Sequence, residues 1–411
     1  MTRHTADIVI VGAGMVGLTA ALALAPSGLK VVVLENRSLD NDVPEPQGYD
    51  PRVSALTCAS QQLLSHVGVW PLMEQVRVSP YTDMDVWDGE GSGKIHFSCR
   101  DLHEDVLGHI VENRVTVSAL LEVASQTANV TVVGDAQVKA VSEVDANGQR
   151  VLTCEDDTQW CAALVVAADG ALSKVRQLAN IPLWEWDYGH HAIVTTVRTE
   201  QPHQQTAWQR FTEDGPLAFL PLDDPYFSSI VWSTSPDHAQ SLMALDDDEF
   251  CHALSRGFEH RLGRIISTEQ RFCVPLRQRH AKYYVKQGLA VIGDAAHTIH
   301  PLAGQGVNLG LMDAAALAEH VLSALSRGEA LGSERVLKRF QRQRQGANLQ
   351  MSAGMEMFKQ LFSHQQPLLK WVRSAGMTTL NQLSPLKQHI VMQAMGLRGE
   401  VPKLARRPID Q

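Results

Sequence analysis

The pattern of hydrophobic and polar positions divides the start of the chain into an uncharged run at 8–11, a glycine-rich segment at 12–17, an Ala/Leu segment at 18–24 and a mainly hydrophobic run at 29–34. Short β-branched runs without polar alternation are typical of strands that a parallel sheet buries on both faces. Strand, glycine turn, helix and strand within about 30 residues predict a βαβ unit. The stretch 8–25 is also long and uncharged enough for a membrane-spanning helix or a signal peptide, but its glycines and β-branched residues argue against both.

The glycine-rich segment has the spacing G-x-G-x-x-G, formed by Gly12, Gly14 and Gly17. Gly12 would permit a tight turn, Gly14 the close approach of a pyrophosphate, and Gly17 the close packing of the helix on the sheet. Glu35 ends the second run, 23 positions after Gly12, where a carboxylate can accept hydrogen bonds from a ribose. The pattern predicts a dinucleotide site, with an ordinary glycine-rich turn as the alternative. By itself it does not distinguish NAD from FAD.

Two further hydrophobic runs, at 164–168 and 289–292, each end in a turn that carries an aspartate. The first is followed by Asp169, and the second by Gly293, Asp294 and a glycine-rich segment that precedes an apolar helix. A carboxylate at a strand end can bind a ribityl chain, and the N-terminus of a helix favours the negative charge of a reduced flavin. Taken alone, Asp169 is also typical of a plain turn. The three motifs together favour FAD.

Composition narrows the class of protein. The chain has 411 residues, with 36 Lys and Arg against 45 Asp and Glu and a net charge of −9. This length predicts about two or three domains, or one large α/β domain with an insertion, and the acidic balance argues against nucleic acid as a partner. The six cysteines contain no C-x-x-C pair, so neither a disulfide framework nor a metal site is expected, and a reducing cytoplasm fits. Residues 330–411 differ, with thirteen Lys and Arg against four Asp and Glu.

The three motifs resemble those of the group A flavoprotein monooxygenases, the para-hydroxybenzoate-hydroxylase-like family. The segment 293–310, which reads Gly-Asp-Ala-Ala-His-Thr-Ile-His-Pro-Leu-Ala-Gly-Gln-Gly-Val-Asn-Leu-Gly, is similar to the hydroxylases of ubiquinone biosynthesis. Segments 186–194, 218–222, 229–233 and 393–397 agree, so the resemblance covers nearly the whole chain. Among the ring hydroxylases of that pathway, the sequence most resembles those that act on a 2-polyprenylphenol such as 2-octaprenylphenol.

This resemblance implies an enzyme that uses FAD, a transient NADPH or NADH reductant and O2 to hydroxylate the ring of a polyprenylphenol, through a flavin C4a-hydroperoxide. It implies no metal, and no catalytic side chain is identified. For Arg52 and Arg114 a surface ion pair is the alternative. The residues expected to bind the cofactor are Gly12, Gly14, Gly17 and Glu35 at the ADP half, Gly293 and Asp294 at the ribityl chain, Pro301, Gly304, Gly306, Val307 and Asn308 along the isoalloxazine, and Arg52, Arg114 and Asp169 near the flavin.

The expected fold is α/β, with a Rossmann-like FAD-binding domain, an inserted antiparallel β-sheet for the substrate and a helical C-terminal tail. Strands are expected at 191–199, 206–212, 217–222 and 227–233, with more from 77–100. A pocket between this sheet and the flavin would bind the substrate, with Phe219, Leu220, Pro221, Trp232 and Pro301 as lining residues or simple core. The predicted division assigns 1–76, 101–180 and 273–332 to the FAD-binding domain, 77–100 and 181–272 to the substrate domain, and 333–411 to the tail.

The tail places Met355, Phe358, Leu361 and Phe362 at helical spacing beside its basic excess. We expect it either to dock on an anionic membrane or a ubiquinone-biosynthesis complex, or to pack on the body as a lid. The expected location is the cytoplasm, peripheral to the inner face of the membrane. Alternative functions are a sister ring hydroxylase of the same pathway, a hydroxylase of another aromatic, a flavoprotein oxidase or dehydrogenase, and a flavin-containing assembly subunit.

Overall fold

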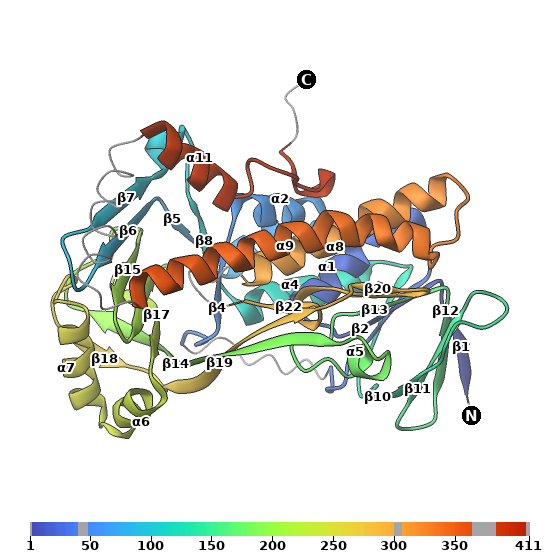
Figure 1. The fold of residues 1–411 in the computed structure, drawn as a ribbon, viewed down its shortest axis with the longest axis horizontal. Helices are drawn as coiled ribbons and strands as arrows, with labels where there is room; N and C mark the ends of the chain where they lie inside the picture. Colours follow the sequence, from blue (N-terminus) through green and yellow to red (C-terminus); the bar gives the residue numbers. More distant parts are fainter. Residues whose placement is uncertain (1, 40–47, 300–305, 364–383, 408–411) are drawn as a thin grey trace.

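The computed structural model describes residues 2–39, 48–299, 306–363 and 384–407. A mainly parallel sheet crosses one half of the molecule (Figure 1), and only its edge strand β20 runs antiparallel to its neighbour. Every residue of β2, β3 and β13 is buried, because α1 (Met15–Leu24) and α4 (Asn113–Gln126) cover the sheet and β12 (Gln159–Ala162) of a smaller sheet also packs against β2. In spatial order its strands are β20 (Val285–Lys286), β21 (Leu289–Val291), β13 (Leu164–Ala167), β2 (Ile8–Val11), β3 (Val31–Leu34) and β9 (Val130–Val133).

The three strands that precede the motifs are neighbours in this sheet. Val11 at the end of β2 pairs with Ala167 of β13, and Ala167 pairs with Val291 of β21. Because the three strands are parallel and end in register, the turns that follow them meet at one edge of the sheet. The prediction of buried parallel strands at these positions is therefore confirmed, although β3 begins at Val31 rather than at residue 29.

Helix α1 (Met15–Leu24) follows β2, and it begins three residues earlier than the predicted segment because Gly14 already serves as its N-cap. α1 packs against α8 (Gly306–Ser326), and α8 packs in turn against α9 (Glu334–Ser363) (Figure 1). α8 is long and apolar enough to cross a membrane, but most of it is buried inside the protein. It is therefore the central helix of this layer.

A large, mostly antiparallel sheet fills the other half, with β18 (Ile265–Thr268) paired to β14 outside the main order. All four strands predicted between 191 and 233 are present, and β14 starts earlier than expected, at Leu183. Two strands from 77–100 join it, with β6 parallel to β15. The order is β22 (His297–Thr298), β19 (Phe272–Ala281), β14 (Leu183–Thr199), β17 (Phe227–Thr234), β16 (Gly215–Pro221), β15 (Thr206–Thr212), β6 (Asp83–Asp88) and β7 (Lys94–Ser98).

The two faces of the large sheet have different partners. Helices α6 (Pro236–Ala244) and α7 (Asp247–Gly257) cover one face, where Phe219 and Trp232 pack with Phe250 and Leu254 in a buried core. We call the opposite side the inner face. Of the two alternatives for Phe219 and Trp232, pocket lining or simple core, the structure shows simple core, because their side chains pack against the helices. Alternation along a strand fixes which residues share a face but not which face meets the ligand.

The strand β19 begins one residue before the predicted boundary at 273, and it pairs with β14 along most of its length. Near its C-terminal end it pairs with β22, which follows the Gly293–Asp294 turn. One strand of the large sheet is therefore bonded directly to the segment after the third motif. A boundary at 273 places this strand in the FAD-binding domain, whereas hydrogen bonding makes it part of the large sheet.

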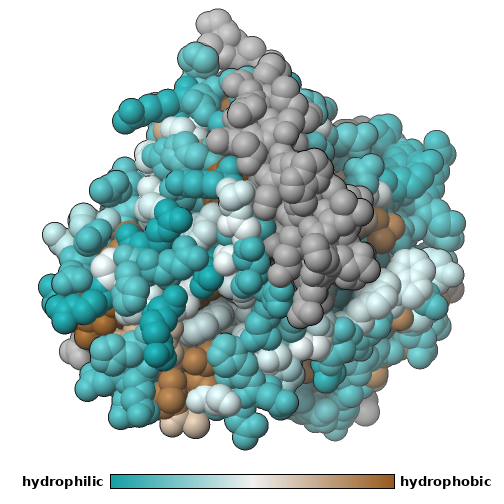
Figure 2. All heavy atoms as spheres, turned by 60° about the vertical axis from the view of Figure 1, so that its left-hand side comes forward, coloured by the Kyte–Doolittle hydropathy of each residue, from teal (hydrophilic) through white to brown (hydrophobic). Residues whose placement is uncertain are grey.

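On the surface shown in Figure 2, hydrophobic residues form small separate groups among hydrophilic ones.

Smaller elements complete the fold. Two further sheets contain β1 (Arg3–Thr5), β12 (Gln159–Ala162), β11 (Arg150–Cys154) and β10 (Val138–Val141), and β4 (Val53–Leu56), β8 (Gly108–Glu112) and β5 (Ser79–Tyr81). The remaining α-helices are α2 (Cys58–His66), α3 (Trp70–Val76), α4 (Asn113–Gln126), α5 (Lys174–Leu178) and α11 (Ser384–Ala394), and the 3-10 helices are η1 (Ala25–Ser27), η2 (Cys99–Leu102), η3 (Gly293–Ala295) and η5 (Lys403–Ala405).

The predicted helical character of the tail is confirmed by α9 and α11. The first half of α9 lies on α8, so at least this part packs on the body. The side chains of Met355, Phe358, Leu361 and Phe362 lie outside the described residues. Docking of the tail on a membrane or a protein complex stays a prediction.

Candidate functional site

The glycine turn after β2 has the mechanics that its spacing predicts. Gly12 adopts a φ of 109°, and a Cβ there would lie 2.4 Å from the carbonyl oxygen of Ala168. A Cβ on Gly17 would lie 2.0 Å from the carbonyl oxygen of Gly12, so α1 can approach the turn only without a side chain. Around Gly14, no atom of the described chain lies within 4 Å of the position of a Cβ. Protein atoms therefore pack tightly against the turn at Gly12 and Gly17, whereas the space beside Gly14 is free for a ligand.

Glu35 follows β3 and reaches back to this turn. Its buried carboxylate accepts a hydrogen bond from the N–H of Ala13 at 2.8 Å and another from the N–H of Arg37 at 3.2 Å. A carboxylate has about four lone-pair sites, so these bonds fix its orientation and leave capacity for a ribose hydroxyl. The position is that of the acid predicted from the sequence.

Asp294 lies in the turn that follows β21, at the same edge of the sheet. Burial by the surrounding protein raises the pKa of its carboxyl, and the charges of His297 and Arg52 oppose that shift. Asp294 is nevertheless accessible to solvent, as is Arg52. Within the described ranges, neither side chain has a hydrogen-bond partner. A recessed but accessible carboxylate, close enough to a guanidinium to feel its charge, is suited to bind a polar ligand.

The N-terminus of α8 adjoins this turn. A Cβ on Gly310 would lie 3.1 Å from the Cα of Gly293, so the helix and the turn are in backbone contact. The first N–H groups of a helix have no acceptor within the helix, and the helix dipole favours negative charge there. The first turn, which includes Gly306 and Val307, is partly exposed. It can therefore present N–H groups to a ligand beside Asp294.

The side chain of Asn308 has a structural role, whereas the sequence predicts a contact with the isoalloxazine. Its side-chain oxygen accepts hydrogen bonds from the N–H of Thr57 at 3.0 Å and from the hydroxyl of Ser60 at 2.7 Å, and its amide donates to the carbonyl of Ala55 at 2.8 Å. It is buried and ties α8 to β4 and α2. The side chain of Asn308 is therefore occupied within the protein, and its contact with a flavin stays a prediction.

The arrangement of glycine turn, acid and Gly-Asp turn agrees with the matches to known proteins. A family model described as "FAD binding domain" matches residues 5–353. The chain belongs to this family. It is a flavoprotein monooxygenase that depends on FAD, and NAD(P)H and O2 are the usual cosubstrates of the family.

Relatives at full length refine the family. The 3-demethoxyubiquinol 3-hydroxylase of Escherichia coli (strain K12) is 38% identical, with 97% of this chain and 100% of that protein covered. The ubiquinone hydroxylase UbiL of Rhodospirillum rubrum is 36% identical over 98% of this chain and 92% of that protein. The mitochondrial ubiquinone biosynthesis monooxygenase COQ6 of Xenopus tropicalis is 35% identical, covering 94% and 92%. The predicted resemblance to ubiquinone-biosynthesis hydroxylases is confirmed.

The fold is likewise that of flavoprotein monooxygenases. The structure of p-nitrophenol 4-monooxygenase PnpA from Pseudomonas putida DLL-E4 superimposes with a TM-score of 0.78 at 19% identity, over 97% of this chain and 100% of that one. The probable FAD-dependent monooxygenase pqsL of Pseudomonas aeruginosa gives a TM-score of 0.73 at 22% identity, over 92% and 100%. The predicted fold class is confirmed.

Two other predicted site residues, Asp169 and Arg114, contact neighbouring groups of the protein. Asp169 accepts hydrogen bonds from the hydroxyl of Ser173 and, at 3.1 Å, from the N–H of Val175, so it caps α5. Arg114 forms an ion pair with Glu112 at 2.7 Å and donates to the carbonyl of Gly48 at 2.7 Å. Both contacts are those of the alternative readings, a turn carboxylate and an ion pair. Their roles toward FAD or NAD(P)H stay predictions, and Pro301 and Gly304 lie outside the described residues.

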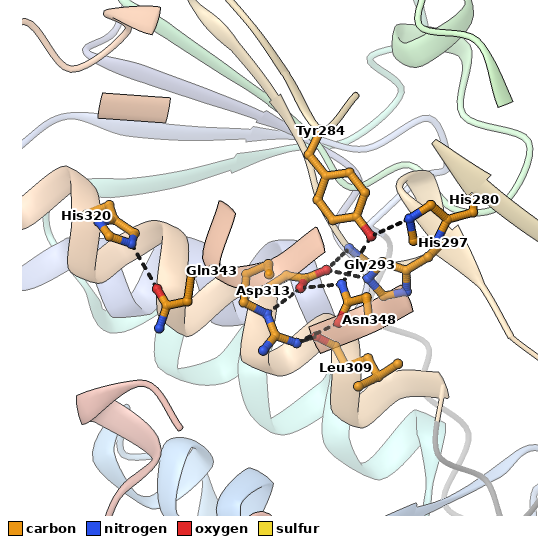
Figure 3. A network of polar contacts seen from close by, with 10 residues as sticks. His280, Tyr284, Gly293, His297, Leu309, Asp313, His320, Gln343 and Asn348 are labelled. Atoms are coloured by element: carbon orange, nitrogen blue, oxygen red, sulfur yellow. Dashed lines mark hydrogen bonds and ion pairs between the residues drawn. The ribbon is translucent and has the colours of Figure 1, made fainter. Parts of the chain in front are cut away.

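Sequence reasoning missed a buried polar cluster behind the Gly-Asp turn (Figure 3). It is centred on Asp313 of α8, whose carboxylate contacts His297, Arg344 and Asn348. An aspartate inside the otherwise uncharged stretch 306–318 is a signal in the sequence for such a buried carboxylate. Arg344 has no such signal, because α9 carries arginines on several sides.

We expect Asp294→Ala to weaken FAD binding by about 10- to 100-fold. The change removes a carboxylate partner of the ribityl hydroxyls, and a hydrogen bond to a charged group contributes roughly 1.5–3 kcal/mol. Titration of the apoprotein with FAD, followed by flavin fluorescence, measures the effect. Asp187→Ala, which removes an exposed carboxylate paired with Arg277 on the large sheet, is the control. Unchanged affinity in Asp294→Ala would reject the role of this residue.

We expect alanine substitutions at Gly14 and Gly17 to have different effects on stability and on FAD binding. Gly17→Ala places a methyl group against the Gly12 carbonyl and should lower the melting temperature of the apoprotein. Gly14→Ala meets no protein atom in the described chain, so the apoprotein should keep its melting temperature while FAD affinity falls. Thermal unfolding and FAD titration of both variants test this. Equal loss of stability in the two would show that Gly14 is structural.

Proposed function

We propose that the protein hydroxylates the aromatic ring of a polyprenylated phenol in ubiquinone biosynthesis, with NADPH or NADH as reductant and O2 as oxygen source. Full-length relatives whose names specify ubiquinone hydroxylation support the pathway. The observation that carries the substrate class is an exposed apolar strip on the inner face of the large sheet.

The strip is defined by Phe272, Val274, Val194 and Val231. Phe272 pairs with Val194, which pairs on its other side with Val231, and Val274 pairs with Ala192. Residues paired directly across strands point to the same side of a sheet. The intervening Cys273 and Ile193 pack toward α6 and α7, so the strip lies on the opposite, inner face.

The strip is apolar and accessible. Phe272 is 41% and Val274 46% exposed, and Val194 and Val231 are partly exposed. They continue the small buried cluster of Tyr188, Ala192 and Leu276 on the same face. Adjoining apolar side chains that remain in contact with water are typical of a surface that binds an apolar ligand. A hydrocarbon tail satisfies this requirement, whereas a small polar aromatic does not need it.

The strip also leads toward the cofactor turn. β19 runs from Phe272 to His280, and His280 pairs with His297 of β22, three residues after Asp294. At about 3.4 Å per residue, this part of β19 is about 27 Å long. That length suits an extended chain whose aromatic head lies at the flavin and whose tail follows the sheet.

The chemistry divides between cofactor and protein. The chemistry that FAD would supply when bound is acceptance of a hydride from NAD(P)H and activation of O2 for transfer to the ring. Glu35, the open turn at Gly14, Arg52 and Asp294 would hold the cofactor, and the N-terminus of α8 favours negative charge beside it. A prenyl tail bound along the inner face would cover its exposed apolar side chains and orient the ring, which would limit loss of the activated oxygen. His297 is buried against Asp313 and does not face a substrate.

A second candidate is hydroxylation at a later stage of the same pathway. The 38% identical relative named 3-demethoxyubiquinol 3-hydroxylase favours it. The ring of 3-demethoxyubiquinol carries more oxygen substituents than that of a polyprenylphenol. The apolar strip suits the tail of either substrate. Direct comparison of the two substrates separates the candidates.

In the assay, the purified protein with FAD is reduced by NADPH without oxygen, with either 2-octaprenylphenol or 3-demethoxyubiquinol present, and isotopically labelled dioxygen is then admitted. We expect the phenol to accelerate flavin reduction and to gain one labelled oxygen atom, as mass spectrometry of the product will show. A labelled product from 3-demethoxyubiquinol alone would favour the second candidate. Hydrogen peroxide without product from either substrate contradicts both.

Phe272→Asp and Val274→Asp test the strip. Each should raise the KM for a long-chain prenylphenol by about 10-fold or more, because burial of such a side chain is worth roughly 1.5–3 kcal/mol. The KM for a phenol with one prenyl unit should change little. Ile266→Asp, on β18 outside the strip and 48% exposed, is the control. An equal rise for both chain lengths would show that the strip does not bind the tail.

A further inference from the structure

We propose that Arg344 and Asp313 are positioning residues for the cofactor site: through Gly293 they hold the Asp294 turn in the conformation that binds FAD, so that α9 is part of this site. The observation is the buried cluster of Figure 3, which joins the turn, α8 and α9 through charged side chains. The inference concerns cofactor binding and does not depend on the identity of the substrate.

Asp313 is completely buried and has donors on both carboxylate oxygens. Oδ2 accepts from Nε2 of His297 at 2.5 Å and from the N–H of Gly293 at 3.2 Å. Oδ1 accepts from Nε of Arg344 at 2.8 Å and from Nδ2 of Asn348 at 3.1 Å. One oxygen therefore faces the cofactor turn and the other faces α9.

Arg344 is buried as well, and its guanidinium is fixed by more than one partner. Besides Asp313, it donates to Oδ1 of Asn348 at 2.8 Å and lies 3.4 Å from the carbonyl oxygen of Leu309 in α8. Asn348 then donates to the hydroxyl of Tyr284 at 3.2 Å. A planar guanidinium held in this way fixes the direction as well as the charge of its contact with Asp313.

The turn itself needs such support. Gly293 has a φ of 58°, and a Cβ there would lie 3.1 Å from Val16, so the backbone passes closely over α1. The N–H of Gly293 is bonded to Asp313, and the next residue is Asp294, whose side chain has no hydrogen bond in the described parts of the chain. The cluster thus holds the chain on both sides of Asp294, at Gly293 and His297, and so fixes the backbone position from which the carboxylate extends.

The alternative is that the cluster only joins α8 to α9 and stabilises the fold. In that case, disruption of the cluster would change the melting temperature and would affect FAD binding equally whether or not Asp294 is present. If the cluster instead acts through Asp294, the two effects on FAD affinity must be coupled. A double-mutant cycle distinguishes these cases.

The cycle uses Arg344→Met, Asp294→Ala and the double variant, with the FAD dissociation constant and the melting temperature of each apoprotein as readouts. We expect Arg344→Met to weaken FAD binding by about 10-fold in the native background and by less than about 2-fold when Asp294 is already Ala. Arg344→Lys, which keeps the charge but not the planar geometry, should recover part of the affinity. Lys338→Met, which breaks an exposed ion pair with Glu334 on the same helix, should leave the affinity unchanged.

Asn348→Ser provides a second cycle if Arg344→Met does not fold, because it loosens Arg344 without leaving a buried charge unpaired. Equal weakening of FAD binding in both backgrounds would overturn the proposal, as would a lowered melting temperature with unchanged affinity. If Asp294→Ala alone leaves the affinity intact while Arg344→Met reduces it, the cluster acts on another part of the turn and the proposal is wrong as stated.

Discussion

A carboxylate buried where three elements meet is the constraint on which the site depends. Asp313 carries its charge into the interior of α8, which is unfavourable unless donors replace water. Burial raises the pKa of Asp313. The charges of His297 and Arg344 and their hydrogen bonds lower it by more, so the resulting pKa is about 2. Because the pKa is depressed, the ionised carboxylate of Asp313 stabilises the fold fully at pH values above its ordinary pKa of 3.8. This contribution is lost as the pH falls through about 2. At neutral pH the cluster is therefore fully in place.

The same helix serves both sides of the cofactor site. Near its N-terminus, Asn308 holds β4 and the start of α2, the region that contains Arg52. Five residues later, Asp313 holds the turn that contains Asp294. α8 is mostly buried and contacts both segments, so it places the backbones that carry Arg52 and Asp294 relative to each other.

The parts of the site that could be predicted are encoded locally. Gly12 and Gly17 are required by contacts within a few residues of the turn or with the adjacent strand, and a strand followed by glycines indicates such a turn. Asn308 and Arg344 could not be assigned in this way, because their partners come from segments remote in sequence. Phe219 and Trp232 illustrate a different limit, since both faces of the large sheet carry apolar residues and only the packing of α6 and α7 decides which face is covered.

The position of Arg344 also determines where the chain can be shortened. The sequence places a division at 333, which suggests a catalytic body followed by a removable appendage. A truncation there would delete the guanidinium that pairs with Asp313, and by the proposal above the shortened protein would bind its cofactor more weakly. A cut after α9, at residue 363, keeps the counter-ion. The first half of α9 is therefore part of the smallest unit that keeps the counter-ion of Asp313.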